Sequence, residues 1–205
     1  MIHLILLKIL FIIIISLFLI VTFTPMILIK KKGGDPHGTH EGSSLLTRLT
    51  PITIFSWLIY IIVFLILDKT ILTYLVFLFL ISDIFELIGI IMISLGLILD
   101  FWGTVALGFN FRIELPKEET TLITTGIYRL MRNPIVVGVF LLAFGSFLII
   151  PTLFSFIFLV VNIITFDSKV RDEEKFLVKR FGEQFEEYSK KVGRYLPFRI
   201  IKRKI

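Results

Sequence analysis

Five long apolar runs, separated by shorter polar segments, dominate the pattern of the chain. They cover residues 4–29, 51–67, 84–100, 134–150 and 152–166. At about 1.5 Å per helical residue, such runs can cross a hydrocarbon core of roughly 30 Å, the last two with local thinning of the bilayer. The pattern predicts an all-α integral membrane bundle of about five transmembrane helices, whose last two form a hairpin turning at Pro151.

Two apolar segments allow alternative interpretations. The first run could be a secretory signal, but it is long, and lysines 30–32 follow it in place of a small-residue cleavage site. We therefore expect a retained helix. Residues 71–81 are too short to span, and they could extend the second helix or lie in the interface. Asp83 and Glu86 mark the expected start of the next helix.

Composition and charge predict the location and orientation of the protein. Of 205 residues, 56% are hydrophobic and 19% charged, more apolar surface than one soluble core could bury. The net charge is +6, and residues 167–205 carry 12 Lys or Arg against 7 Asp or Glu, which is +5 of that total. Anionic headgroups explain this basic tail without nucleic acid. The positive-inside rule makes the loops that carry residues 30–48 and 112–132 and the C-terminus cytoplasmic, with residues 68–69 and the turn at Pro151 on the other side. The absence of Cys and the high Ile content point to a prokaryotic plasma membrane.

The chain divides into two parts in this interpretation. Residues 1–100 hold about three spans and a cytoplasmic loop at 30–50, whereas residues 101–205 hold a polar loop, the hairpin at 134–166 and C-terminal helices. The lack of Cys excludes thiolate nucleophiles and cysteine-ligated metals. We expect the working chemistry in the second part, because its polar segments are too long and too patterned for linkers.

The first polar segment ends in the sequence GIYRLMRNP, residues 126–134. Pro134 is well placed for the first turn of a helix, and Asn133 can cap it. The free amides at such a helix start can bind an anionic or polar group. A capped helix with cationic membrane anchors is the simpler alternative.

The second polar segment follows the hairpin and shows helical periodicity. Its apolar residues form a stripe under a charged face, which predicts an amphipathic helix on the membrane surface. The stripe consists of Leu177, Phe181, Phe185, Tyr188 and Val192.

Two adjacent carboxylates stand where the last span leaves the bilayer. Glu173 and Glu174 point about 100° apart on a helix, so at most one is expected to face a shared cavity. Lys169 and Arg171 are close enough in sequence to neutralise them, which is the structural alternative to a functional role.

From about Trp102 to Phe198 the sequence resembles the isoprenylcysteine carboxyl methyltransferases and the related phospholipid methyltransferases. These are small multi-span enzymes that use S-adenosylmethionine without a Rossmann domain. The matching positions, in order, are Leu107, Gly108, Asn110, Gly126, Tyr128, Arg132, Pro134, Glu173, Glu174, Phe181, Gly182, Tyr188, Leu196 and Pro197.

The resemblance implies an S-adenosylmethionine-dependent membrane methyltransferase acting on a lipid-like or prenylated acceptor that enters from the bilayer. Its cofactor would lie between the 126–134 turn and the glutamate pair. Glu173 or Glu174 would bind ribose hydroxyls or the amino group, and Arg132 the carboxylate. The implied catalytic residues are Glu173, Glu174 and Arg132. The implied cofactor-binding residues are Gly126, Tyr128, Arg132, Asn133, Pro134, Gly138, Glu173 and Glu174.

Three positions depart from the family pattern. Asn133 stands where His is usual, Val136 where Tyr is frequent, and Lys169 where an Arg commonly precedes the glutamates. Asn keeps a donor and an acceptor, so cofactor binding remains possible. The acceptor stays open between an isoprenylcysteine carboxylate and a phospholipid amine, and for an amine Glu173 or Glu174 could take the proton.

Two other functions remain as alternatives. Membrane sterol reductases that use NADPH have a similar C-terminal block, and residues 171–173, 181–182 and Tyr188 are compatible with it. A non-catalytic scaffold or transporter is the other, although the span centres hold little polar beyond Ser, Thr and Asn162.

One further loop contains possible metal ligands. Asp35, His37, His40 and Glu41 could in principle gather an ion, but the glycine-rich spacing gives no fixed geometry. We expect a mobile cytoplasmic loop and no metal.

Overall fold

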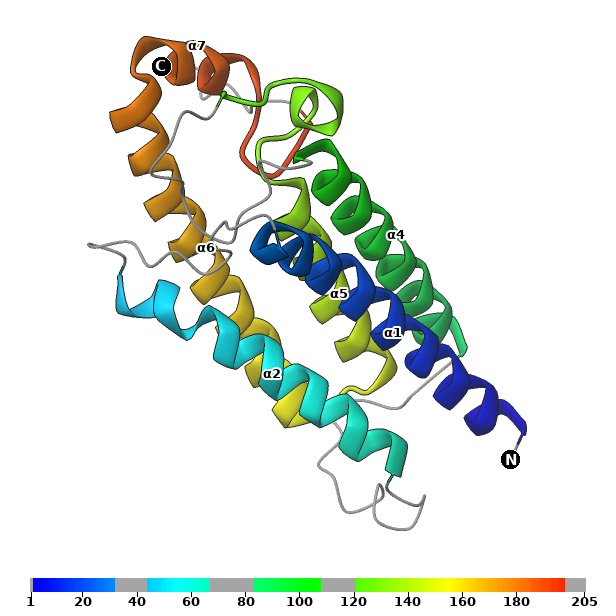
Figure 1. The fold of residues 1–205 in the computed structure, drawn as a ribbon. Coiled ribbons are helices and arrows are strands. Elements are labelled where there is room, and N and C mark those ends of the chain that lie inside the picture. The colour runs from blue at the N-terminus through cyan, green and yellow to red at the C-terminus, as the bar shows by residue number, and fades with distance from the viewer. Residues whose placement is uncertain (1, 32–43, 67–82, 108–120, 198–205) are drawn as a thin grey trace.

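The computed structural model describes residues 2–31, 44–66, 83–107 and 121–197. Within these ranges the named elements are all helices, and an isolated bridge pairs Met131 with Gly193 (Figure 1). The elements are α1 (Ile2–Lys31), α2 (Leu45–Ile66), α4 (Asp83–Leu107), the 3₁₀ turn η2 (Gly126–Arg129), α5 (Pro134–Ile149), α6 (Leu153–Phe181) and α7 (Glu183–Lys191). The predicted all-α fold is confirmed.

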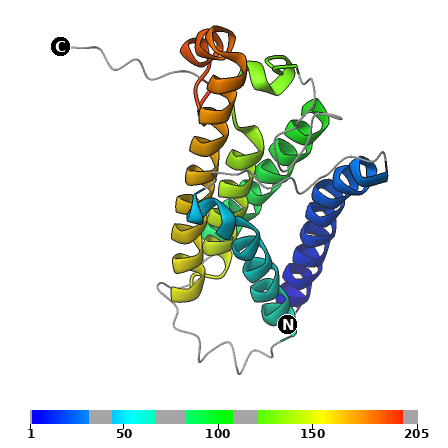
Figure 2. The ribbon, with the colours of Figure 1, turned by 60° about the vertical axis from the view of Figure 1, so that its left-hand side comes forward.

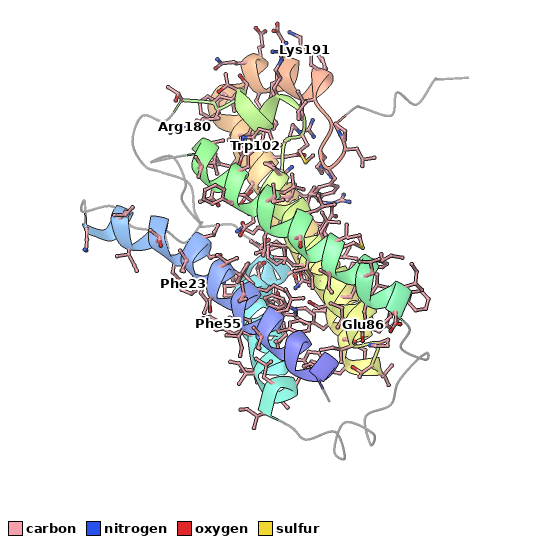
Figure 3. All side chains as sticks on the ribbon, turned by 90° about the vertical axis from the view of Figure 1, so that its right-hand side faces the viewer. Phe23, Phe55, Glu86, Trp102, Arg180 and Lys191 are labelled. Carbon is pink, nitrogen blue, oxygen red and sulfur yellow. The ribbon has the colours of Figure 1, made fainter. Side chains whose placement is uncertain are left out.

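The five expected spans correspond to five apolar helices. Helices α2, α4 and α6 are each long and apolar enough to cross a membrane, whereas α5 and the Ile9–Thr24 part of α1 are shorter apolar helices. Large apolar side chains such as Phe23 and Phe55 point away from the bundle, where lipid would meet them (Figure 3). The chain is an integral membrane protein. Residues 71–81 and 35–41 lie outside the described residues.

Two helix boundaries differ from the sequence interpretation. α2 begins at Leu45, ahead of Pro51, because the Ser44 side chain accepts a hydrogen bond from the Thr47 amide at 3.2 Å and caps the helix. α4 continues past Asp100 to Leu107, so it carries the chain beyond the predicted span toward η2.

The packing of α4 against α5 depends on glycines. Gly96 lies opposite Gly138, and Gly89 opposite Gly145, so the two helices run antiparallel. A Cβ added at Gly96 would lie 2.7 Å from the Gly138 carbonyl oxygen, and one at Gly145 would lie 2.6 Å from that of Gly89. Only the absence of side chains permits this approach, a packing mode common between membrane helices.

The turn between α5 and α6 supports the predicted hairpin at Pro151. Thr152 and Ser155 form a capping box at the start of α6. The Tyr60 hydroxyl lies 2.8 Å from the Thr152 hydroxyl, which ties α2 to this turn. Figure 2 shows α2 crossing beside α5 and α6, with α1 on the outer side. Aromatic side chains fill the space between α1 and α2, including Phe11 against Phe64 and Phe18 against Trp57.

The expected amphipathic surface helix is divided in two. α6 runs unbroken from the hairpin to Phe181, the chain turns at Gly182 with a φ of +49°, and α7 follows. Glycine adopts this backbone conformation without the penalty that a side chain would add. Of the predicted stripe, Phe185 and Val192 are buried, because α7 folds back over the end of the bundle.

Candidate functional site

The 126–134 turn and the C-terminal residues 192–195 form one polar junction at the end of the bundle. The Arg132 amide donates to the Gly193 carbonyl at 2.9 Å, and the Asn133 amide donates to the Arg194 carbonyl at 3.2 Å. Figure 3 shows this end of the molecule, with Trp102 and Lys191 near it and Glu86 at the far end of α4. Segments about 60 residues apart in sequence therefore meet where α4, α5 and α6 leave the apolar layer.

Asn133 is the N-cap residue of α5, the position predicted for it. It is the residue before α5, with Pro134 at the first turn as expected, yet its side chain makes no capping hydrogen bond. Its amide nitrogen Nδ2 donates instead to the Arg194 carbonyl at 3.2 Å. Asn133 therefore caps α5 by its position in the backbone, while its side chain fastens the C-terminal segment.

Glu174 is held by two arginines. Its Oε1 accepts from Nη2 of Arg132 at 2.7 Å and from Nε at 3.0 Å. Its Oε2 accepts from Arg194, from Nη2 at 2.5 Å and from Nε at 3.1 Å. The Glu174 side chain is only 14% exposed, so these charges meet in a partly dry environment, where paired arginines are effective partners.

Arg132 links this carboxylate to the backbone that follows α7. Its Nη1 donates to the Ser189 carbonyl at 2.8 Å and to the Val192 carbonyl at 2.9 Å. The guanidinium also stacks toward the Phe185 ring, with Cζ 6.0 Å from the centroid. Arg132 thus joins α5, α6 and the end of α7 at one point.

Glu173 has a different environment from its neighbour. Its only ion pair among the described residues is with Lys169 at 3.7 Å, one turn earlier on α6. Its side chain is 34% exposed. Burial raises the pKa of Glu173, against the lowering effect of Lys169. The expectation that only one of the two carboxylates faces a given space is thus consistent with their separate partners.

Tyr128 lies buried beneath the junction. Its backbone carbonyl accepts a hydrogen bond from the Tyr188 hydroxyl at 2.5 Å, and its own hydroxyl lies 3.5 Å from the Gly103 carbonyl of α4. Burial, with the nearby charges of Glu173 and Asp100, raises the pKa of the Tyr128 phenol. Gly126 begins this turn with a φ of +61°, and among the described residues a Cβ there would meet Ala106 alone, at 3.8 Å.

A second polar contact ties the start of α2 to α6 beside Glu173. Asp172 accepts hydrogen bonds from the Ser44 amide at 2.9 Å and the Thr47 hydroxyl at 2.7 Å. These hydrogen bonds and Lys175 lower the pKa of Asp172, although burial opposes them. The N-terminal part of the chain is therefore anchored one residue from a predicted site residue.

The structure adds residues that the sequence interpretation did not assign. Arg194 and Tyr195 come close to α6, where the Tyr195 hydroxyl donates to Asp167 at 2.7 Å. Arg171 pairs with Asp167 rather than with the glutamates, also at 2.7 Å. No sequence signal separates Arg194 from the other basic residues of the tail, since its partners are distant in sequence.

Asp100 is a further unassigned residue. It was expected only as the end of a span, yet its side chain is buried, with 3% of the residue exposed. Its Oδ2 has no hydrogen-bond partner among the described residues, and neither does Oγ1 of Thr104, one turn later on α4. A carboxylate within an apolar run is the signal that could have drawn attention to it.

Gly138 lies apart from the junction, in the α4–α5 contact, where it faces Gly96 and Asp100. The other predicted residues, from Gly126 to Pro134 together with the glutamates, lie around the junction. Their roles toward a cofactor stay predictions. Within the described ranges no group of His, Cys, Asp or Glu is suited to hold a metal ion.

Comparison with known proteins confirms the resemblance. Residues 84–184 match the family described as phospholipid methyltransferase. The chain is 31% identical over 117 residues to a protein-S-isoprenylcysteine O-methyltransferase of Xenopus laevis, which covers 55% of this chain and 41% of that protein. It is 31% identical over 118 residues to the Saccharomyces cerevisiae protein of that name, covering 54% and 48%. It is 33% identical over 114 residues to protein-S-isoprenylcysteine O-methyltransferase B of Arabidopsis thaliana, covering 54% and 58%.

The match therefore spans roughly half the length of these relatives. The family match at residues 84–184 includes α4 from its second residue, η2, α5 and the whole of α6.

Proposed function

We propose that this chain is an S-adenosylmethionine-dependent membrane methyltransferase that transfers a methyl group to a lipid-like or lipidated acceptor. The observation that carries the proposal is the match of residues 84–184 to the phospholipid methyltransferase family, because this range contains the 126–134 turn and both glutamates. The relatives named above are methyltransferases, and no contact among the described residues favours a reductase or a transporter instead.

The acceptor groups around the junction suit the proposed cofactor. Glu173 has a single, long ion pair among the described residues, to Lys169 at 3.7 Å, which leaves its carboxylate oxygens open to further donors. The hydroxyl and ammonium donors of S-adenosylmethionine match such oxygens. A Cβ added at Gly126 would have a single neighbour among the described residues, so the backbone there can approach a ligand closely. When bound, the cofactor supplies an electrophilic methyl group on a sulfonium.

Within this proposal the two glutamates have separate tasks. Glu173 accepts hydrogen bonds from the cofactor and, for an amine acceptor, takes its proton. Glu174 and Arg132 act as positioning residues, since their hydrogen bonds hold α6 and residues 189–192 together. This assignment narrows the sequence interpretation, which left either glutamate and Arg132 in contact with the cofactor.

The surrounding residues exclude water and leave the bilayer open as an entry route. Ile127 and Tyr128 of η2 are buried, which favours a dry reaction site. The apolar acceptor enters between helices from the lipid, and positioning it against the methyl group supplies much of the rate enhancement. We place the junction on the cytoplasmic face of a prokaryotic plasma membrane, on the charge distribution of the chain.

Calorimetric titration of the detergent-purified protein with S-adenosylhomocysteine tests the proposal, with NADPH titrated in parallel. Glu173→Gln is the site variant, and Glu183→Gln, on the exposed surface of α7, is the matched control. We expect the wild type and Glu183→Gln to bind S-adenosylhomocysteine, and Glu173→Gln to bind it about tenfold more weakly. Binding of NADPH alone would replace the proposal with the reductase, and binding of neither ligand would reject both.

A further inference from the structure

Asp100 and Thr104 form a buried pair of acceptors on one face of α4. They are four residues apart, so one lies above the other on the helix surface. Asp100 is 3% exposed and Thr104 is 6% exposed. Neither Asp100 Oδ2 nor Thr104 Oγ1 has a hydrogen-bond partner among the described residues. Burying such groups without partners costs free energy, and an ionisable residue inside a span usually has a functional reason.

The surroundings of this pair point toward the proposed site. Gly138 of α5 lies opposite Asp100, so that a Cβ there would stand 3.4 Å from the Asp100 Cβ. On the other side, the Tyr128 hydroxyl reaches the carbonyl of Gly103, which lies directly before Thr104. The pair therefore lies on the part of α4 that Tyr128 of η2 contacts, and Tyr128 lies within electrostatic range of both Asp100 and Glu173.

The chemistry of the pair favours a cationic donor. A carboxylate and a hydroxyl oxygen accept hydrogen bonds, and an ammonium group carries three donors together with the opposite charge. A carboxylate ligand would be repelled by Asp100, and a neutral apolar group would leave both oxygens unpaired. Lys169, the cation paired with Glu173, belongs to α6 and has its own partner.

We propose that Asp100 and Thr104 bind a protonated amine carried by a ligand of this enzyme. The inference rests on the proposed methyltransferase function and assigns a recognition role to two residues outside the predicted site. The amine has two sources with the same chemistry, the amino group of S-adenosylmethionine and the ammonium headgroup of an amine lipid that accepts the methyl group.

The test uses the full-length protein in lipid nanodiscs and two nucleoside probes. S-adenosylhomocysteine carries the amino group, whereas 5′-methylthioadenosine keeps the nucleoside and thioether and lacks the amino acid. Affinities of both probes are measured for the wild type, Asp100→Asn and Thr104→Val. Thr50→Val is the matched control, because Thr50 is also buried with an unpartnered hydroxyl, but lies on α2.

If the amine is that of the cofactor, Asp100→Asn lowers the affinity for S-adenosylhomocysteine about tenfold, and Thr104→Val lowers it about threefold. The affinity for 5′-methylthioadenosine stays unchanged in both variants. If the amine belongs to the acceptor, both variants keep their affinity for the probes. They then lose methyl transfer to phosphatidylethanolamine vesicles while keeping transfer to a prenylcysteine carboxylate. Either pattern, absent from Thr50→Val, supports the amine site and identifies its source.

Two results would overturn the inference, and they differ from failure of the proposed function. In the first, Asp100→Asn and Thr104→Val keep both probe affinities and methyl transfer to both acceptors. This result would contradict the amine site and leave the proposed methyltransferase function standing. A wild-type protein that binds no S-adenosylhomocysteine and transfers no methyl group would reject the proposed function, and the amine site with it. If Asp100→Asn does not fold, Thr104→Val alone decides between these outcomes.

Discussion

Two contacts within the same half of the chain are stabilised in opposite ways. The glycine interface, formed by Gly89 and Gly96 of α4 against Gly138 and Gly145 of α5, lacks side chains and brings backbones together. The charged junction, formed by Arg132, Glu174 and Arg194 with the carbonyls of residues 189 and 192, consists of long polar side chains.

The difference follows from the surroundings of each contact. Between helices in lipid, apolar side chains gain little from leaving the solvent, so close backbone packing contributes more. At the end of the bundle, water competes for polar groups, and charges must be partly buried and well oriented before a pair contributes. The glycine interface should therefore tolerate no added volume, whereas the charged junction should tolerate no loss of charge.

The largest expected effect is from Gly145→Leu. Even a Cβ at this position would lie 2.6 Å from the Gly89 carbonyl oxygen and 2.7 Å from Ile93 Cγ1, so the helices must separate. We expect a loss of about 3 kcal/mol or more, seen as a lowered melting temperature in detergent. Ser94→Ala, on the exposed side of α4, should change stability by less than about 0.5 kcal/mol. Equal melting temperatures for the two variants would contradict the role of the glycine interface.

Glu174→Gln should have the next largest effect. It removes the carboxylate that Arg132 and Arg194 share. The Glu174 side chain is only 14% exposed, so water can replace this carboxylate only in part. Breaking a buried pair costs about 3–5 kcal/mol, and residual exposure reduces this to roughly 2 kcal/mol. Hydrogen exchange should rise in residues 183–195. Glu187→Gln, on the exposed surface of α7, is the control, and equal exchange in both variants would show that the junction does not hold α7.

Asp172→Asn should weaken the anchor of α2 by about 1 kcal/mol, since a charged acceptor of two hydrogen bonds is replaced. The pKa of Asp172 is lowered in the fold, so its contribution is present above the ordinary Asp pKa and is lost as the pH falls through the lowered value. Melting temperatures of the wild type and variant should differ at neutral pH and converge in acid. A difference that is independent of pH would contradict the assignment.

The smallest effect on stability is expected from Glu173→Gln. The pair with Lys169 is long, at 3.7 Å, and one third of the Glu173 side chain is exposed, so the change should be within about 0.5 kcal/mol. The same substitution should reduce binding of S-adenosylhomocysteine. Comparing the melting temperatures of Glu173→Gln and Glu174→Gln therefore distinguishes the roles of the two adjacent carboxylates. A loss of stability in Glu173→Gln as large as that in Glu174→Gln would make Glu173 a structural residue.

Much of the fold was predictable from local sequence. Apolar runs long enough to span a bilayer predicted five helices. Pro151 predicted the hairpin turn, and Pro134 predicted the start of α5. Each of these features depends on backbone hydrogen bonds between residues close in sequence. The ion pair of Lys169 and Glu173 was also predictable, since residues four apart on a helix are neighbours. The exact ends of α2 and α6 were not, because Ser44 and Gly182 act through cap and turn geometry.

The site depended on contacts that no local pattern encodes. Arg132 and Glu174 are 42 residues apart, and Asn133 donates to a carbonyl 61 residues away. Sequence motifs placed these residues in one functional set, but only tertiary packing decided that Glu174 is neutralised by two arginines while Glu173 is not. The sequence by itself determined a membrane bundle with a polar C-terminal half, since hydrophobicity and helix periodicity are local properties. The partners of each charge, including the absence of one for Asp100 Oδ2 among the described residues, were decided by which distant helices meet.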